Sequence, residues 1–123
     1  MRVRATYVEV PVLDMERAQA FYRDVFEVDV RRTVIDGHNA CVIDDDDAGA
    51  SDGAVIALML GESYVPSVDG TRVYITVTSV ERTLSRAVAH GGAELYPVTV
   101  ADDGLVVAEF RDSEGNRAAL SNR

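Results

Sequence analysis

The chain has 123 residues, of which 47% are hydrophobic and 27% are charged, and these values predict a single globular domain. Its formal net charge is −9 and all twelve basic residues are arginine, which argues against nucleic acid or an anionic membrane as a partner. No apolar run approaches the roughly 20 residues that span a bilayer, and no signal-peptide pattern opens the sequence, so we expect a cytoplasmic protein.

The first half of the chain predicts a strand, a helix and three further strands. The strands are expected at 6–12, 28–35, 40–43 and 54–60. Asp14 is typical of a helix N-cap, and apolar residues recur at helical spacing over 15–25. Asp36-Gly37 is a turn signal between two of the strands. The acidic run 44–47 opens a loop that we interpret as solvated surface rather than a cation site, because the spacing of a calcium loop is absent.

The second half predicts the same order of elements after a linker over 61–70. The strands are expected at 72–77, 94–100, 105–110 and 117–120. Ser79 is an N-cap candidate, and a helix over 80–88 is expected to end near His90, before Gly91-Gly92. The sequence therefore predicts an α+β fold made of two βαβββ modules.

An internal repeat supports this reading. Residues 12–17 align with residues 77–82 at an offset of 65, and in both segments a strand ends, an N-cap follows and Glu-Arg lies in the first helical turn. We expect one domain over 1–123, with a first module over about 1–62 and a second over about 70–123.

Three segments, in this order, carry a resemblance to a known family. They are residues 10–26, Gly91-Gly92-Ala93 and residues 110–117. Together they resemble the vicinal oxygen chelate superfamily, which includes glyoxalase I, extradiol dioxygenases and the fosfomycin and bleomycin resistance proteins. The resemblance implies a curved, mostly antiparallel sheet around a cavity. It also implies a homodimer that completes this cavity.

The resemblance also implies where four metal ligands would lie. The corresponding positions hold Tyr7, Ala57, Arg72 and Ala119. Alanine has no donor atom, arginine has no lone pair to offer, and Tyr7 could bind a cation only as a phenolate. We therefore expect no metal and no other cofactor, although metal-dependent members of the superfamily use the ion as a Lewis acid.

Strand alternation and the resemblance together predict the residues that line the cavity. They are Tyr7, Glu9, Ala57, Met59, Arg72, Tyr74, Glu109 and Ala119. Glu9 and Glu109 either pair with Arg72 and Arg117, or serve as a general base or as a cation-binding group. Tyr64, in the linker, would cover the cavity mouth or contact a partner.

Our leading hypothesis is a metal-independent, homodimeric small-molecule-binding protein, similar to the bleomycin resistance proteins and with an unknown ligand. One alternative is a metal-independent isomerase or lyase that uses Glu9 or Glu109 as its base. A second alternative is a glyoxalase-like, metal-dependent lyase whose ligands the sequence does not reveal.

Overall fold

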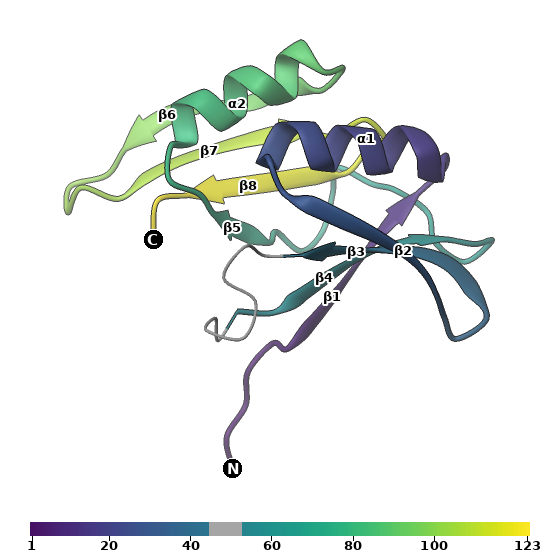
Figure 1. Cartoon of the computed structure of the whole chain (residues 1–123). Coiled ribbons are helices and arrows are strands. Elements are labelled where there is room, and N and C mark those ends of the chain that lie inside the picture. Colours follow the sequence, from purple (N-terminus) through teal and green to yellow (C-terminus); the bar gives the residue numbers. More distant parts are fainter. Residues whose placement is uncertain (45–52) are drawn as a thin grey trace.

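The computed structural model describes residues 1–44 and 53–123 and confirms an α+β fold in which one order of elements occurs twice (Figure 1). The first module contains β1 (Tyr7–Val12), α1 (Met15–Phe26), β2 (Asp29–Ile35), β3 (His38–Asp44) and β4 (Val55–Leu60). The second contains β5 (Tyr74–Thr76), α2 (Val80–Ala89), β6 (Ala93–Val100), β7 (Val106–Arg111) and β8 (Arg117–Ser121). Among the described residues, neither helix has the length and apolar character that crossing a membrane requires.

Both helices begin at the predicted caps. The side chains of Asp14 and Ser79 accept hydrogen bonds from the backbone N–H groups of Arg17 and Arg82. These bonds satisfy donors that the first turn of a helix would otherwise leave free. The repeated cap chemistry therefore explains why α1 and α2 start at positions 65 residues apart.

Each module forms a mixed four-stranded sheet. The strand orders are β1-β4-β3-β2 and β5-β8-β7-β6, with one parallel pair in each sheet, β1 with β4 and β5 with β8. In the register of the first sheet Glu9 is opposite Ala57, and in the second sheet Tyr74 is opposite Ala119. Tyr74 is the counterpart of Glu9 at the 65-residue offset, so the two modules place different chemistry at equivalent positions. The module boundaries near 62 and 70 stay a prediction.

Two strands have an end that differs from the prediction by more than one residue. The strand expected over 72–77 covers only Tyr74–Thr76, so Arg72 precedes it instead of opening it. The N–H of Arg117, at the start of β8, donates to the carbonyl of Ser67, and this linker contact replaces a longer β5 ladder. In contrast, β3 begins earlier than expected, at His38, because Asp36 and Gly37 have positive φ and form a tight turn that extends the pairing.

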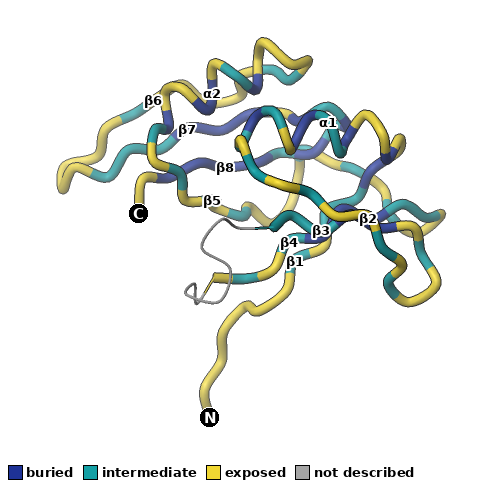
Figure 2. Tube along the Cα trace, in the orientation of Figure 1, coloured by how far each residue is buried: buried dark blue, intermediate teal, exposed yellow. Residues whose placement is uncertain are grey.

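The core lies where the helices pack between the two modules. The ring centroids of Phe21 and Phe110, from different modules, are 5.9 Å apart, and those of Phe26 and Phe110 are 6.2 Å apart. Buried segments gather along α1, β7 and β8 (Figure 2). The lone cysteine, Cys41, is buried in the same cluster, as expected of a small apolar residue.

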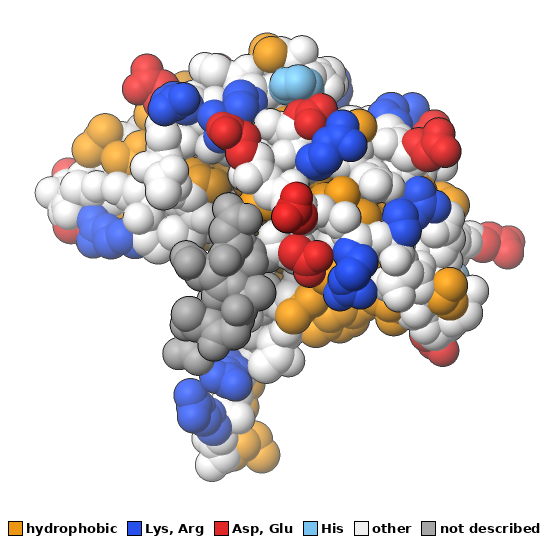
Figure 3. Space-filling view, in the orientation of Figure 1, with side chains coloured by type: hydrophobic (Ala, Val, Ile, Leu, Met, Phe, Trp, Pro, Cys, Tyr) orange, Lys and Arg blue, Asp and Glu red, His pale blue; other side chains and the backbone are white. Residues whose placement is uncertain are grey.

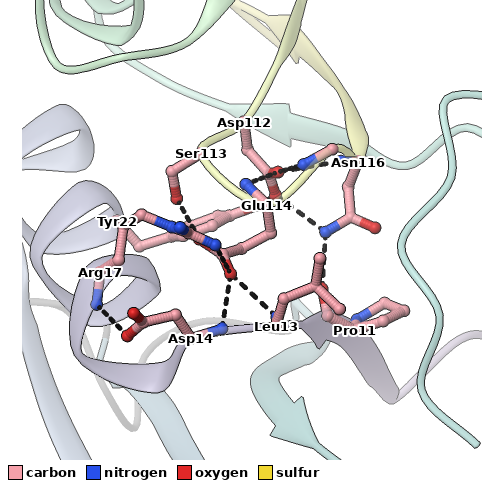
Figure 4. Close-up of polar contacts among 10 residues, drawn as sticks. Pro11, Leu13, Asp14, Arg17, Tyr22, Asp112, Ser113, Glu114 and Asn116 are labelled. Carbon is pink, nitrogen blue, oxygen red and sulfur yellow. Dashed lines mark hydrogen bonds and ion pairs between the residues drawn. The ribbon is translucent and has the colours of Figure 1, made fainter.

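The turn formed by residues 112–116 joins the second module to the first (Figure 4). One carboxylate oxygen of Asp112 accepts hydrogen bonds from three successive backbone N–H groups of the turn, and the other accepts from the Tyr22 hydroxyl at 2.6 Å. The side-chain amide of Asn116 donates to the Pro11 carbonyl at 2.7 Å. Gly115 has a φ of 105°, a left-handed backbone conformation that glycine adopts without a steric penalty.

Glu114 lies in the same turn and reaches the start of α1. Its Oε1 atom accepts from the backbone N–H groups of Leu13 and Asp14, both at 2.9 Å, and its Oε2 atom accepts from Arg17 at 2.7 Å. Burial raises the pKa of Glu114, but the bonds from Arg17 and from these two N–H groups outweigh it and lower the pKa to about 2. The carboxylate therefore stays charged and ties the two modules together.

Candidate ligand-binding site

The predicted cavity residues lie on the faces of the two sheets that the helices do not cover, which we call the outer faces. The first-sheet group consists of Tyr7, Glu9, Ala57 and Met59, and the second-sheet group consists of Arg72, Tyr74, Glu109 and Ala119. The strand registers place the members of each group side by side, except for Arg72, which reaches its group from the linker. In the described part of the chain no hydrogen bond or ion pair joins the two groups.

In the first-sheet group, Glu9 is held by two tyrosines. The hydroxyl of Tyr7 donates to Glu9 Oε2 at 2.7 Å, and the hydroxyl of Tyr64 donates to Glu9 Oε1 at 2.9 Å. The interpretation that Glu9 pairs with an arginine is therefore wrong for this residue. The two arginines that were expected to pair with Glu9, Arg72 and Arg117, instead form ion pairs with Glu109 of the second sheet.

Tyr64, which was expected to cover the cavity mouth or contact a partner, lies in the linker and contacts the first-sheet group. The linker turns back over the first sheet, so that Tyr64 packs against the buried cluster of Ala57 and Met59. Its ring meets the edge of His38, with centroids 5.3 Å apart. In the sequence, Tyr64 stands out as an aromatic residue in a linker that contains glycine and proline. The sequence does not show which part of the sheet such a linker will contact.

In the second-sheet group, Glu109 forms ion pairs with two arginines. Arg117 Nη1 lies 2.8 Å from Glu109 Oε1, and Arg72 Nη1 lies 3.4 Å from Glu109 Oε2. Glu109 is 5% exposed, so these partners compensate a buried charge. The Nε of Arg117 also donates to the carbonyl of Val68, which fixes this guanidinium against the linker. The side chain of Arg72 is half exposed, and its contact with Glu109, the one ion pair it forms among the described residues, uses one of its five N–H donors.

The residues at the four implied ligand positions do not fit a metal ion. Ala57 and Ala119 are fully buried and have no donor atom, and Arg72 can only donate. Partial burial and the hydrogen bond to Glu9 raise the pKa of Tyr7 to about 12, which disfavours the phenolate that a metal would need. Across residues 1–44 and 53–123, no cluster of three or more His, Cys, Asp or Glu side chains could hold a metal. Asp45, Asp46 and Asp47 of the acidic run lie outside the described residues.

Two hollows lie between the modules. The larger, of about 480 Å³, is lined by Tyr22, Phe26, Ile56, Ile75 and Arg86, on the helix-covered side of the sheets. The smaller, of about 210 Å³, is lined by Glu9, Pro11 and Arg117 together with linker residues. Of the eight predicted cavity residues, Glu9 lines the smaller hollow and the other seven line neither.

Ion pairs neutralise part of the surface charge. Acidic and basic side chains are interspersed on the face that carries α1 (Figure 3). Arg23 pairs with Asp24 at 2.9 Å, and Arg86 pairs with Glu27 at the same distance. The expectation that the protein has no nucleic-acid or membrane partner stays a prediction based on net charge.

The sequence and the order of elements agree with a known family. A family model of the glyoxalase/bleomycin resistance protein/dioxygenase superfamily matches residues 4–120. The chain belongs to this superfamily. The matched segment covers nearly the whole chain, including both sheets and the turn that joins the two modules.

Several solved structures share the fold at low sequence identity. A glyoxalase/bleomycin resistance protein from Albidiferax ferrireducens T118 is 17% identical, with a TM-score of 0.73, over 96% of this chain and 97% of that one. TioX from Micromonospora sp. ML1 is 23% identical, with a TM-score of 0.67, over 97% and 98%. A glyoxalase I mutant from Zea mays is 18% identical, with a TM-score of 0.70, and this chain covers 48% of its length. No curated protein matches the chain.

Proposed function

We propose that the protein is a metal-independent, small-molecule-binding member of its superfamily that acts as a homodimer. The observation that carries this proposal is the chemistry at the four implied ligand positions. Ala57 and Ala119 present only methyl groups, and Arg72 presents a guanidinium group. At the fourth position, the hydroxyl of Tyr7 donates a hydrogen bond to Glu9. What remains on the outer faces is a set of aromatic and polar groups, which suits recognition of a small molecule.

The exposure of the two tyrosines on the strands supports binding at these faces. Tyr7 is 45% exposed and Tyr74 is 53% exposed, although each projects from a strand next to buried alanine. A large aromatic surface left open in this way favours a partner or a ligand that covers it.

The ion pairs also bear on the alternative of a catalytic base. Each carboxylate oxygen of Glu109 accepts a hydrogen bond from a guanidinium group, so its negative charge is already paired with two cations. Proton abstraction by Glu109 would remove the charge that these two ion pairs depend on. The arrangement therefore favours binding over acid–base chemistry at this residue.

A second copy of the chain would unite the two groups. A two-fold axis that places the first outer face of one protomer against the second outer face of its partner forms two equal sites. The first-sheet group carries the charge of Glu9, whereas Arg72 of the second-sheet group and the neighbouring Arg117 together outweigh the charge of Glu109. Opposite charges on facing surfaces favour this pairing.

The test of this proposal combines molar mass with ligand binding. Light scattering during gel filtration is expected to give about twice the 13.3 kDa of one chain. Tyr74→Glu, which adds a charge to the facing surface, is expected to give monomers and to lose binding of anilinonaphthalene sulfonate, an anionic dye whose rings bind apolar surface. Val34→Glu is the matched control, because Val34 is 70% exposed but points away from the outer face. A monomeric wild-type protein, or dye binding that persists in a monomeric Tyr74→Glu, would contradict the proposal.

A further inference from the structure

We propose that Glu9, Tyr7 and Tyr64 form a binding site for the ammonium group of the ligand. This inference rests on the proposed function, since it names the chemistry that one end of the cavity recognises. The ligand class it assigns is an amine that is charged at neutral pH, or a quaternary ammonium compound.

Glu9 is a carboxylate without a cationic partner in the described part of the chain. Its side chain is exposed, and none of the ion pairs among the described residues includes it. Each of its oxygens accepts one tyrosine hydroxyl, which leaves about two of its four lone-pair positions open. The two hydroxyl groups orient the carboxylate but do not neutralise it, so a cation still gains from binding there.

The tyrosine rings provide the second half of the recognition. The hydroxyl groups of Tyr7 and Tyr64 reach different oxygens of one carboxylate, so both aromatic side chains end at Glu9. Both phenols act as donors and are therefore neutral, with π faces that attract a cation. The sulfur of the fully buried Met59 lies 4.0 Å from the Tyr7 hydroxyl and packs beneath it.

The surrounding charges select Glu9 over Glu109 for this role. Glu109 already has two guanidinium groups, so an incoming cation would meet net positive charge there. The hollow of about 210 Å³ beside Glu9 gives room for the rest of a ligand. The side chains that line this hollow include a second carboxylate, Asp69, and Arg117. Arg117 forms an ion pair with Glu109.

The inference is tested with three probes of similar shape and different charge. They are benzyltrimethylammonium, its neutral carbon isostere neopentylbenzene, and benzenesulfonate. Titration of the full chain, followed through backbone amide NMR shifts, is expected to show the cation binding at Glu9 and Tyr64 about tenfold more tightly than the neutral isostere. Glu9→Gln is expected to remove this preference.

The matched control is Glu62→Gln, which changes the net charge by the same amount at an exposed position two residues from Tyr64. It should leave the affinity for the cation within about twofold, because exposed charges are screened. Tyr64→Phe keeps the ring and loses the hydroxyl, and should weaken binding by a smaller factor than Glu9→Gln.

The outcomes separate this inference from the proposed function. Equal binding of the cation and its neutral isostere, or a cation affinity that Glu9→Gln leaves unchanged, would overturn the ammonium site. If neutral or sulfonate probes still shift the outer-face amides, the proposed small-molecule function stands without it. If no probe shifts these amides, both ideas are overturned.

Discussion

Replacing Asp112 by alanine is expected to lower the free energy of unfolding by about 3–5 kcal/mol, because the change leaves several buried donors without an acceptor. The Asp112 carboxylate is 2% exposed and accepts five hydrogen bonds. Three of the donors are backbone N–H groups of the 112–116 turn, one is the hydroxyl of Tyr22, and one is the side-chain amide of Asn116. The measurement is urea denaturation followed by circular dichroism.

Two further variants test whether the loss of stability comes from the hydrogen bonds of the Asp112 carboxylate. Asp112→Asn keeps one acceptor oxygen but turns an amide toward the Tyr22 hydroxyl or the turn, so it should cost less than the alanine change and still exceed about 1 kcal/mol. Ser113→Ala, in the same turn, removes one bond to Glu114 and is expected to cost about 1 kcal/mol or less. A small loss in Asp112→Ala, comparable with that of Ser113→Ala, would show that the turn does not hold the modules together.

Glu114→Gln is expected to cost about 2–3 kcal/mol at neutral pH, since an amide cannot replace a charge that accepts from Arg17 and from two backbone N–H groups. The side chain of Glu114 is fully buried, whereas that of Arg17 is half exposed. Arg17→Met should therefore cost less than Glu114→Gln, because the two N–H partners remain.

The pH dependence of this difference has a definite sign. The pKa of Glu114 is lowered from 4.5 to about 2 in the folded protein. A lowered folded pKa contributes stability that is present above the unfolded pKa and is lost as the pH falls toward the folded one. The stability gap between wild type and Glu114→Gln should thus be full near neutral pH and shrink as the pH falls from about 4.5 toward 2. A gap that stays constant over this range would contradict the charged state of Glu114.

Local chemistry made most of the fold predictable. Asp14 and Ser79 begin helices because their side chains accept from the first turn, and this chemistry can be read from a short segment. The two-residue period of a strand puts Glu9 on the same face as Tyr7 without knowledge of the rest of the chain. The order of elements in both modules followed from such local signals.

The partners of the site residues could not be predicted in the same way. Tyr64 reaches Glu9 across 55 residues, and its position depends on how the linker folds over the first sheet. Glu114 and Leu13 meet across 101 residues through the packing of one module on the other. Arg72 was expected on a strand, yet it reaches Glu109 from a linker whose contacts shorten β5. Sequence spacing carries no information on these long-range approaches.

The division of the site into two outer faces is also a property of the folded chain. Alternation placed residues correctly on the face of each sheet, but it could not show how one sheet lies relative to the other. The modules share one core on their helix-covered faces, and among the described residues no hydrogen bond or ion pair joins the two site groups. This arrangement is the reason that the proposed function includes a second copy.

Metal content is the most direct test of the central claim, which is that the protein binds a small molecule without a metal. Elemental analysis of protein purified without chelators is expected to find zinc, nickel, iron and manganese each far below one ion per chain. Addition of these ions should leave the thermal unfolding temperature unchanged, because Ala57, Arg72 and Ala119 offer no ligand. One bound ion per chain or per dimer, together with a raised unfolding temperature, would contradict the account.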